Sequence, residues 1–387
     1  MTALTLSGAP ERVCPDHAAG DVELRLATAA DDPDIRALLA ATPVEGPVVL
    51  TYEREPDYFL GCSTMGRRVE TLVARHRTTG DLIALACRAV RPLWVNGVVR
   101  DVGYLGHLRV SRRYRGRSLV QRGFRVLGGM DRGAPLAGYL TTIVEGNSEA
   151  LGVLVRRARP GMPSYRERAR VCTLVIPARA GRSCRDRSLV LADGGTCDLH
   201  EVVDYLQRAG SFRQFFPAYE QRDFLPAAPL TRGFDPRNFL VAARQGQIAG
   251  VLGVWDQSAF KQVMVRGYRG VMAWARPVVA LAAPFLGYPS PPRAPGPLRI
   301  AYASFLAIGG DRADTFGALL REALGRASQV GCDYLALALA DNDPLLKTAR
   351  AFPHRMYVSR LFTVDWRGGA FYDEAAGGVP YVDIASF

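Results

Sequence analysis

A turn near residue 113 combines the residue types that could hold a diphosphate. It follows the pattern Arg-x-x-Gly-x-Ser within a run of further arginines, and its residues are Arg112, Arg113, Tyr114, Arg115, Gly116, Arg117 and Ser118. A diphosphate needs several converging donors, which guanidinium groups and the free N–H groups of a helix start supply. Glycine leaves room for the backbone itself to approach the phosphates. The turn therefore predicts an anion site, and an arginine-rich surface loop without a ligand is the alternative.

The elements around this turn would direct its backbone toward a ligand. Residues 102–110 are predicted to form a strand, and a long amphipathic helix begins near Arg117. The apolar face of that helix carries Leu119, Val120, Phe124 and Leu127. A strand at 139–144 then precedes a helix at 147–157. A strand that leads through a turn into a helix exposes the N–H groups of the helix start, so this order supports the anion site.

The strand, the turn and the helix together resemble the acyl-CoA motif of the GNAT superfamily of N-acetyltransferases. Residues 144–150 (VEGNSEA) resemble the next strand and helix start of that family, where an Asn-x-x-Ala pattern is usual. The likeness covers residues 22–177 and, more faintly, 189–366. It implies direct attack of an amine acceptor on the thioester of acetyl-CoA, the acyl donor, without a metal. Backbone N–H groups would meet the oxyanion that forms.

The resemblance also implies which residues bind acetyl-CoA. The backbone of Leu108, Arg109 and Val110 would separate from a neighbouring strand and bind the pantetheine arm. Asn147 would face the pantetheine arm or the acyl end. The pyrophosphate would be held by the amides of Arg113, Tyr114, Arg115, Gly116, Arg117 and Ser118.

The catalytic groups that are usual in this family are missing from their positions. Many members carry a Glu on the motif strand and a Tyr in the helix after Asn-x-x-Ala, but here these positions hold Gly106 and Leu154. Tyr104, on the same strand face as Gly106, and Tyr165, which follows the helix, are the candidate catalytic residues. Each is otherwise a packed aromatic. His107, on the opposite strand face, is expected to have a core or surface role. Certain tandem members use the terminal carboxylate as base, which the end of this chain also allows.

The order of elements recurs in the second half of the chain, which predicts an internal duplication. Tyr139 and Tyr334 lie 195 residues apart, and Asn147 and Asn342 fall at the same offset. The sequence therefore predicts an α+β protein of the α/β three-layer kind. It would contain two tandem GNAT folds, each with a mixed, mainly antiparallel central sheet flanked by helices.

The second copy is expected to be non-catalytic because its turn lacks the cationic frame. At the same offset the replacements are Arg113 by Ile308, Gly116 by Asp311 and Ser118 by Ala313. A carboxylate at this turn would repel a pyrophosphate. The predicted organisation is a GNAT domain with the acyl-CoA site at 21–178, a linker at 179–187, a degenerate GNAT-like domain at 188–368 with an apolar insertion at 269–297, and a C-terminal tail at 369–387.

The apolar stretch 271–288 (VMAWARPVVALAAPFLGY) tests whether the chain enters a membrane. A spanning helix needs about 20 apolar residues with an unbroken backbone ladder, whereas this stretch contains Arg276, Pro277 and Pro284. No transmembrane segment is therefore expected. The stretch is predicted to be a buried or pocket-lining helical insertion, with contact to a membrane surface or a partner as the alternative.

Composition limits the kind of ligand and the compartment. The 387 residues carry a net charge of +12, almost entirely through arginine, since Lys261 and Lys347 are the only lysines. No run of five or six basic residues occurs, so a small anionic ligand is expected rather than nucleic acid. The seven cysteines are widely spaced without a CxxC pair, which indicates neither a disulfide framework nor a zinc site. Reduced thiols and the absence of a signal-peptide pattern predict a cytoplasmic protein.

The acceptor is expected to be a small-molecule or peptide amine. Acidic residues gather where the family binds its acceptor and favour a cationic one, although a solvated acidic loop explains them equally well: Glu45, Glu53, Glu55 and Asp57. Two alternatives to an acetyltransferase stay open. One is a non-catalytic regulatory protein that binds acyl-CoA, and the other is a transferase that uses aminoacyl-tRNA. A homo-oligomer is also compatible with the sequence.

Overall fold

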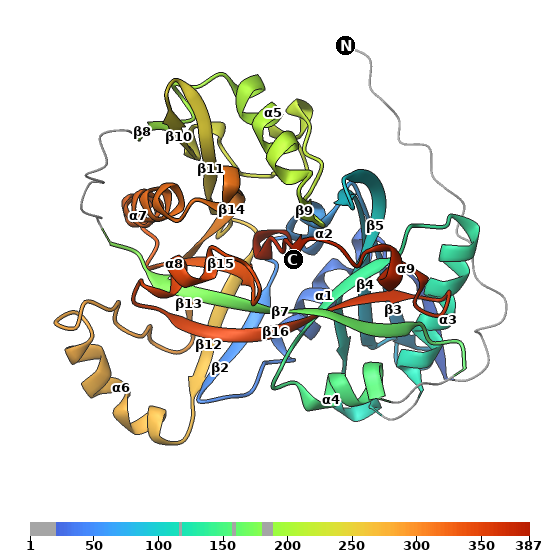
Figure 1. Cartoon of the computed structure of the whole chain (residues 1–387). Helices are drawn as coiled ribbons and strands as arrows, with labels where there is room; N and C mark the ends of the chain where they lie inside the picture. Colours follow the sequence, from blue (N-terminus) through green and yellow to red (C-terminus); the bar gives the residue numbers. More distant parts are fainter. Residues whose placement is uncertain (1–20, 116–117, 157–159, 180–188) are drawn as a thin grey trace, which may run out of the picture.

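The computed structural model describes residues 21–115, 118–156, 160–179 and 189–387. Within these residues one sheet of twelve strands runs through both halves of the molecule (Figure 1). From one edge to the other, its strands are β1 (Val22–Leu26), β3 (Arg68–His76), β4 (Leu82–Val95), β5 (Val98–Val110), β6 (Tyr139–Val144), β16 (Arg355–Asp365), β7 (Ser164–Pro177), β15 (Tyr334–Ala340), β14 (Ile300–Ile308), β11 (Gln247–Asp256), β10 (Phe239–Arg244) and β8 (Val190–Asp193).

The two halves exchange strands at the centre of this sheet. Strand β16, from the end of the chain, lies between β6 and β7, and β7 pairs with β15 from Tyr334↔Pro177 to Ala340↔Val171. Each half therefore contributes a strand to the other. The apolar patterns of β7 and β16 predict strands at these positions, but a pattern does not specify the partner, so the exchange is not visible in the sequence.

Helices cover both faces of the first half of the sheet. On one face α1 (Asp32–Ala40) and α2 (Tyr58–Cys62) pack over Leu85 and Tyr104. On the other face α3 (Leu119–Gly133) and α4 (Ser148–Leu151) pack over Leu105. Neighbouring residues of β5 thus point to opposite faces, as in any strand. In the second half α5 (Leu199–Gly210) lies on one face, and α7 (Ala313–Gln329) with α8 (Leu346–Arg350) on the other.

A small second sheet joins the two halves. Its order is β13 (Gly296–Leu298), β12 (Gln262–Tyr268) and β2 (Val48–Glu53), and β2 and β12 pair from Gln262↔Glu53 to Tyr268↔Val48. Neither β2 nor β12 is expected from the sequence pattern. The pairing brings the residues that follow β2 next to those that precede β12, although they are about 200 positions apart in the chain.

The apolar stretch forms helix α6 (Val271–Ala282), as predicted, but its expected burial is wrong. No residue of α6 is buried, and Trp274 is 88% exposed. The helix lies apart from the main sheet at the lower left of Figure 1. Its sequence is apolar around most of its circumference, which is why a core position was expected. No helix among the described residues has the length and hydropathy to cross a membrane.

The chain from residue 369 onward packs between the halves. It forms α9 (Ala370–Glu374), then β17 (Val379–Pro380), which pairs with β9 (Arg213–Gln214). The 3₁₀ turn Ile384–Ser386 follows near the centre of the molecule, where Figure 1 marks the end of the chain. Ala385 in this turn is fully buried. The segment therefore places side chains beside the open end of the β5–β6 pair.

Candidate functional site

Strands β5 and β6 separate partway along their length. They pair only at Gly103↔Tyr139 and Tyr104↔Leu140, whereas β5 stays paired with β4 as far as Val110. Beyond Tyr104 no strand among the described residues pairs with the edge of β5 that faces β6, where the Thr141 hydroxyl donates to the carbonyl of Leu105 at 2.7 Å. A strand edge of this kind offers its N–H and C=O groups to a ligand. The separation expected at Leu108, Arg109 and Val110 is present.

A β-bulge lies inside the separated part of β5. Leu85 pairs with Arg109 and Cys87 with Gly106, so His107 and Leu108 together face one residue of β4. His107 adopts the left-handed conformation, with φ of 53°. Such a bulge turns one backbone amide out of the ladder. It also breaks the simple alternation of faces on which the expected position of His107 was based.

Tyr104 fills the space where the family usually carries its acidic side chain. A Cβ added to Gly106 would lie 3.0 Å from Cε1 of Tyr104. A glutamate at position 106 would therefore require the Tyr104 ring to move. The ring of Tyr104 therefore packs against the position where the glutamate would stand.

The turn after β5 lies between a strand and a helix, which is the order of elements that the sequence predicts. A 3₁₀ turn, Arg112–Tyr114, follows the strand, and the buried Tyr114 packs in a cluster with Ile83. Ser118, with φ of 52°, immediately precedes the 15-residue helix α3. Gly116 and Arg117 lie outside the described residues. The turn thus leads directly into a helix N-terminus, where N–H groups and the helix dipole favour an anion.

The arginines of the turn differ in what they contact. Arg115 pairs with Glu149 at 2.7 Å on the surface, and Arg113 places its guanidinium 5.7 Å from the centre of the Tyr114 ring. Asn147 caps α4, because its side chain accepts a hydrogen bond from the amide of Ala150 at 3.0 Å. Asn147 thus has a structural role, and its role toward the pantetheine arm stays a prediction.

The two candidate catalytic tyrosines lie on opposite faces of the sheet. Tyr165, on β7, packs edge-on against Phe124 and Phe362 in the cluster beneath α3. Burial raises the pKa of its hydroxyl above the ordinary value. Tyr104 belongs to the cluster beneath α1 and α2. The structure therefore does not bring the two hydroxyls into one cavity.

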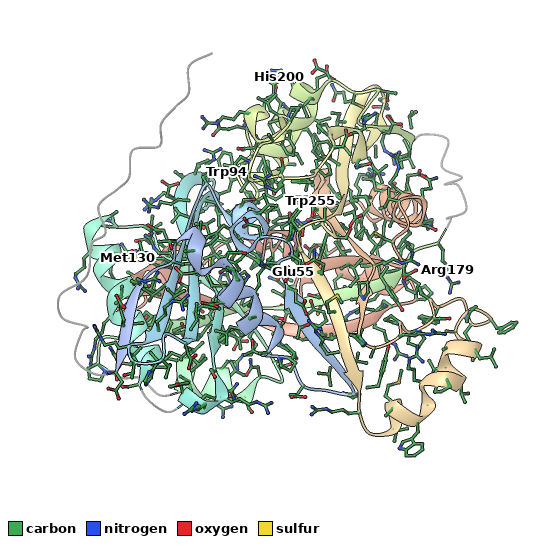
Figure 2. All side chains as sticks on the ribbon, turned by 180° about the vertical axis from the view of Figure 1, so that it is seen from behind. Glu55, Trp94, Met130, Arg179, His200 and Trp255 are labelled. Atoms are coloured by element: carbon green, nitrogen blue, oxygen red, sulfur yellow. The ribbon has the colours of Figure 1, made fainter. Side chains whose placement is uncertain are left out.

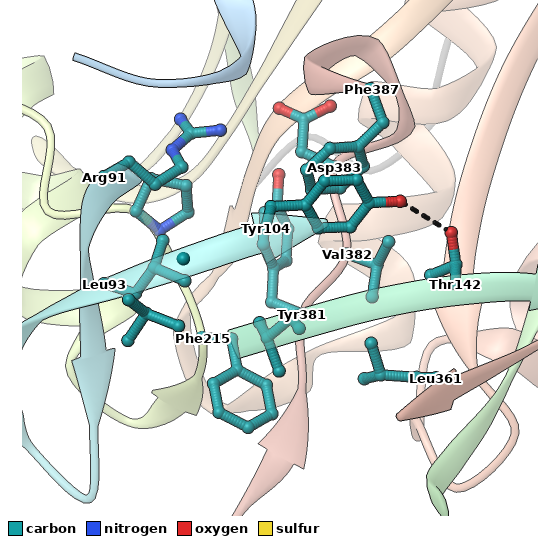
Figure 3. A pocket seen from close by; sticks show the side chains of 14 residues that line it. Arg91, Leu93, Tyr104, Thr142, Phe215, Leu361, Tyr381, Val382, Asp383 and Phe387 are labelled. Carbon is teal, nitrogen blue, oxygen red and sulfur yellow. Dashed lines mark hydrogen bonds between the residues drawn. The ribbon is translucent and has the colours of Figure 1, made fainter. Parts of the chain in front are cut away.

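Tyr104 lines a small cavity at the point where β5 and β6 separate (Figure 3). Its hydroxyl and the Thr142 hydroxyl on β6 are 2.8 Å apart, and the Phe387 ring stacks on it with centres 3.7 Å apart. Burial raises the pKa of Tyr104 to about 12. The cavity has a volume of about 20 Å³ and is also lined by Arg91 and Asp383. This volume is enough for one water molecule.

Asp383 brings a buried carboxylate to this cavity, and the sequence did not single it out. Its Oδ1 accepts hydrogen bonds from the Ser304 hydroxyl at 3.1 Å and the Ala385 amide at 3.0 Å. Its Oδ2 is buried and has no hydrogen-bond partner among the described residues. Burial raises the pKa of Asp383, and the charge of Arg91 opposes that rise. A carboxylate oxygen without a partner is suited to accept a proton.

Buried cations gather beside the bulge. Arg54 is 3% exposed and Lys261 is 6% exposed, while Arg109 is half-buried. Among the described residues no carboxylate forms an ion pair with any of the three; Lys261 donates instead to the carbonyls of Ile384 and Ala385, at 3.1 and 3.2 Å. Burial and the neighbouring charge of Arg54 lower the pKa of Lys261 well below its ordinary range. Burial of positive charge without a carboxylate partner is costly, and the lowered pKa of Lys261 reflects that cost. A bound anion would offset the cost and favour the charged form of Lys261, which marks the cluster as a place for an anion.

His107 joins this cluster as a neutral side chain. Nη2 of Arg54 lies 3.2 Å from Nε2 of His107, and a guanidinium only donates, so Nε2 accepts and Nδ1 carries the hydrogen. Nδ1 then faces the Tyr58 hydroxyl at 3.2 Å. Burial, followed by the charges of Arg54, Arg109 and Lys261, lowers the pKa of His107 well below its ordinary value. One signal for this cluster is present in the sequence: Lys261 is one of only two lysines in an arginine-rich chain.

The four acidic residues expected to bind the acceptor already have partners within this chain. Glu55, near the middle of the molecule in Figure 2, pairs with Arg36. The remaining pairs are Glu45 with Arg112 and Arg269, Glu53 with Arg266, and Asp57 with the amide of Leu60. The charge that is left uncompensated near the bulge is therefore positive.

The second half repeats the separation and the bulge but not the turn. Strands β14 and β15 pair only from Ile300↔Tyr334 to Tyr302↔Ala336, and Phe305, with φ of 56°, holds the bulge position. The bulges of the two halves lie 198 residues apart, so the predicted offset of 195 is wrong at this strand, although it places Tyr139 and Tyr334 at the same register. Helix α7 begins after four residues instead of eight.

The bulge of the second half is closed by the chain itself. The amide of Leu306, which follows Phe305, donates to the Tyr381 hydroxyl at 3.2 Å. Asp311, in the short turn, pairs with Arg213, which also pairs with Asp343 at 2.7 Å. Both features that could receive an acyl-CoA in this half, the bulge amide and the turn, are occupied by side chains of the chain.

No protein-family model and no curated protein matches the sequence. The fold is similar to that of the N-myristoyltransferase of Saccharomyces cerevisiae, in a structure with bound myristoyl-CoA, with a TM-score of 0.58 and 12% identity over 90% of this chain and 80% of that one. It is also similar to a GCN5-related N-acetyltransferase from Sphaerobacter thermophilus, with a TM-score of 0.52 and 14% identity over 96% of this chain and 99% of that one. The predicted GNAT fold is confirmed.

Proposed function

We propose that this protein is an acyltransferase that moves an acyl group from a CoA thioester to an amine at one site, in its first half. Acetyl-CoA is the simplest donor. The observation that carries the proposal is the open edge of β5 from the bulge at His107 to the turn that enters α3. Pantetheine would lie along this edge, and the pyrophosphate would meet the N-terminus of α3. The CoA thioester in the similar yeast enzyme supports this choice of donor.

The reaction needs a group that stabilises negative charge on the thioester oxygen. The acceptor nitrogen attacks the carbonyl carbon, the new C–N bond forms, the C–S bond breaks, and CoA leaves as a thiolate that takes up a proton. We assign the contact with the oxyanion to the amide of Leu108, because the matching amide of Leu306 donates to the Tyr381 hydroxyl, outside its ladder. One such backbone donor is typically worth about 10²- to 10³-fold in kcat.

Proton movement is assigned to the cavity beside Tyr104. Asp383 accepts the proton that the acceptor nitrogen loses, through a water molecule for which the cavity has room. With its pKa raised to about 12, Tyr104 stays protonated and donates a hydrogen bond to the reacting centre. Tyr165 is less suited to this role because it lies on the other face of the sheet.

The buried cations favour an acceptor that carries an anionic group, such as a carboxylate, next to its amine. Arg54, Arg109 and Lys261 lie beside the bulge, where the acyl carbonyl would sit, and the nearby acids are already paired. A carboxylate bound there would hold its own amine near the thioester. The proposed acceptor thus carries an anionic group, whereas the acidic residues of the sequence favour a cationic acceptor.

Calorimetric titration with acetyl-CoA, longer acyl-CoAs and CoA tests the donor, and thiol release over a panel of amines tests the reaction. We expect micromolar or tighter binding of an acyl-CoA and turnover with a carboxylate-bearing amine. Failure to bind any CoA derivative would refute the proposal. Binding without thiol release for every amine would favour the regulatory alternative. Binding of charged tRNA that weakens steeply with salt would favour the aminoacyl-tRNA alternative.

A further inference from the structure

Helix α6 and the turn that follows it carry a stripe of large apolar side chains that none of the described residues covers. Trp274, Val278 and Leu281 are spaced by four and three residues, which places them on one face of α6, and Phe285 follows four residues later in the turn after the helix. They are 88%, 70%, 75% and 88% exposed. Leu286, in the turn that follows, is 71% exposed and extends the stripe. Exposed apolar patches of this kind mark interaction surfaces.

The stripe is held in place rather than loosely attached. Nε of Arg276, inside α6, donates to the carbonyl of Pro292 at 3.2 Å, and the Tyr268 hydroxyl donates to the same carbonyl at 2.8 Å. The Ser290 hydroxyl donates to the carbonyl of Ala280 at 2.9 Å. These bonds tie the helix to the proline-rich segment behind it. The apolar face is therefore presented outward by a defined scaffold.

Charge around the helix indicates which partner fits. Between Asp256 and Asp311 the sequence has no acidic residue at all. The same stretch contains six basic residues. Lys261 is buried, and Arg266, Arg269 and Arg299 pair with Glu53, Glu45 and Asp333, which leaves Arg276 and Arg293 near the helix without an ion pair to a described carboxylate. A second copy docked through the same face would bring like charges together. An anionic surface would be attracted to them.

We propose that α6 and the turn to Leu286 form a docking element for the surface of an anionic phospholipid bilayer. Tryptophan and phenylalanine bind at the boundary between headgroups and acyl chains, and arginine contacts the phosphates. A helix of twelve residues is about 18 Å long, too short to cross the apolar core of a bilayer of about 30 Å. The helix therefore lies along the interface. This inference does not depend on the proposed acyl transfer.

Co-sedimentation of the full chain with vesicles tests the docking element. We compare phosphatidylcholine vesicles with vesicles that also contain phosphatidylglycerol, without any acyl-CoA. We expect binding at least about tenfold tighter to the anionic vesicles, weakened by salt. The double variant W274E/F285E should lose at least about tenfold in affinity. The matched control F212E/V190E replaces two other exposed apolar residues, which are 84% and 63% exposed, and should bind like the unchanged protein.

Two further measurements decide the outcome. The emission of Trp274, obtained as the difference from a W274F variant, should shift to shorter wavelength when anionic vesicles are added. Binding that W274E/F285E leaves unchanged, or no binding at all, overturns the proposal. A dimer detected by light scattering that W274E/F285E abolishes, without vesicle binding, would identify a second copy as the occupant and also overturn it.

Discussion

The regions where β5 leads into α3 and where β14 leads into α7 have the same backbone plan and different chemistry. Both strands separate from their parallel neighbour and both carry a bulge residue with positive φ, His107 in one and Phe305 in the other. They differ in the turn, which spans eight positions in the first half and four in the second. The strand architecture thus survives independently of the residues that would bind a ligand.

The second difference is what occupies the opened strand. In the second half the Tyr381 hydroxyl accepts the bulge amide, and Phe305 is fully buried among aromatic side chains. In the first half the bulge residue is a half-buried histidine beside uncompensated cations. The second half therefore packs apolar side chains at its separated strands, whereas the first half has polar groups at the same place.

A carboxylate in the turn before α3 would give it the charge of the turn before α7. Gly116→Asp places in the first turn the kind of residue that Asp311 supplies in the second. We expect acetyl-CoA binding to weaken by about 100-fold, or about 2.7 kcal/mol, because a carboxylate repels the pyrophosphate. Calorimetric titration measures this. The control, Asp311→Asn, should leave binding unchanged, and an unaltered affinity of G116D would show that the turn does not hold the diphosphate.

Asp383→Asn tests whether the carboxylate beside Tyr104 takes up the proton. We expect kcat to fall by about 100-fold with little change in acetyl-CoA affinity. Because burial raises the pKa of Asp383, the kcat of the parent protein should fall as the pH drops through that raised value. D383N should lack this acidic limb of the pH profile. The pH dependence of kcat is the measurement. Ser304→Ala, which removes one partner of Asp383, is the control and should keep the limb.

The same substitution separates a catalytic from a structural role. A carboxyl with a raised folded-state pKa binds protons more tightly in the folded than in the unfolded protein, so it favours folding at low pH and loses that contribution as the pH rises through the folded pKa. Asparagine keeps an oxygen for Ser304 and Ala385. D383N should therefore not lower the thermal stability at neutral pH, and a lowered Tm together with lost activity would contradict the assignment.

We expect the buried cations Arg54, Arg109 and Lys261 to bind the acceptor rather than the CoA donor. Arg54→Met and Lys261→Met are each expected to raise KM for a carboxylate-bearing amine about tenfold, through loss of a charge-assisted contact. The KM for the corresponding acceptor in which the carboxylate is converted to a carboxamide should change by less than about threefold. Initial-rate kinetics with both acceptors measure the ratio. Lys347→Met, at the other lysine, which is exposed, is the control, and an equal loss with both acceptors would assign the cluster to the reaction itself.

Local features of the site are visible in the sequence because they depend on neighbouring residues. The turn from Arg112 to Ser118 and the helix that follows it are encoded by glycine, arginine and a helical period over a few positions. The glycine at position 106 likewise shows directly that the glutamate usual in this family is missing. Features of this kind need no knowledge of distant partners.

The rest of the site depends on contacts between distant segments. Lys261 meets Arg54 only because β12 pairs with β2, and Asp383 reaches Tyr104 only because the last segment packs between the halves. The exchange of β7 and β16 is equally non-local. A bulge also shifts the strand register without a recognisable change in the amino-acid sequence. The predicted repeat offset of 195 residues is therefore wrong at β14. Periodicity indicates that a strand exists but not its neighbour.

Tyr381 allows a test of the bulge amide in the second half. Tyr381→Phe removes the hydroxyl that accepts from the Leu306 amide, so the bulge amide of the second half loses its side-chain partner. The lost hydrogen bond should lower the free energy of unfolding by about 1 kcal/mol, which denaturant titration can measure. Acetyl-CoA affinity and stoichiometry should stay the same, because the short turn at Asp311 still lacks a cationic frame. A second equivalent of bound acetyl-CoA in Y381F would show instead that the bulge amide alone, and not the turn, decides which half binds the donor.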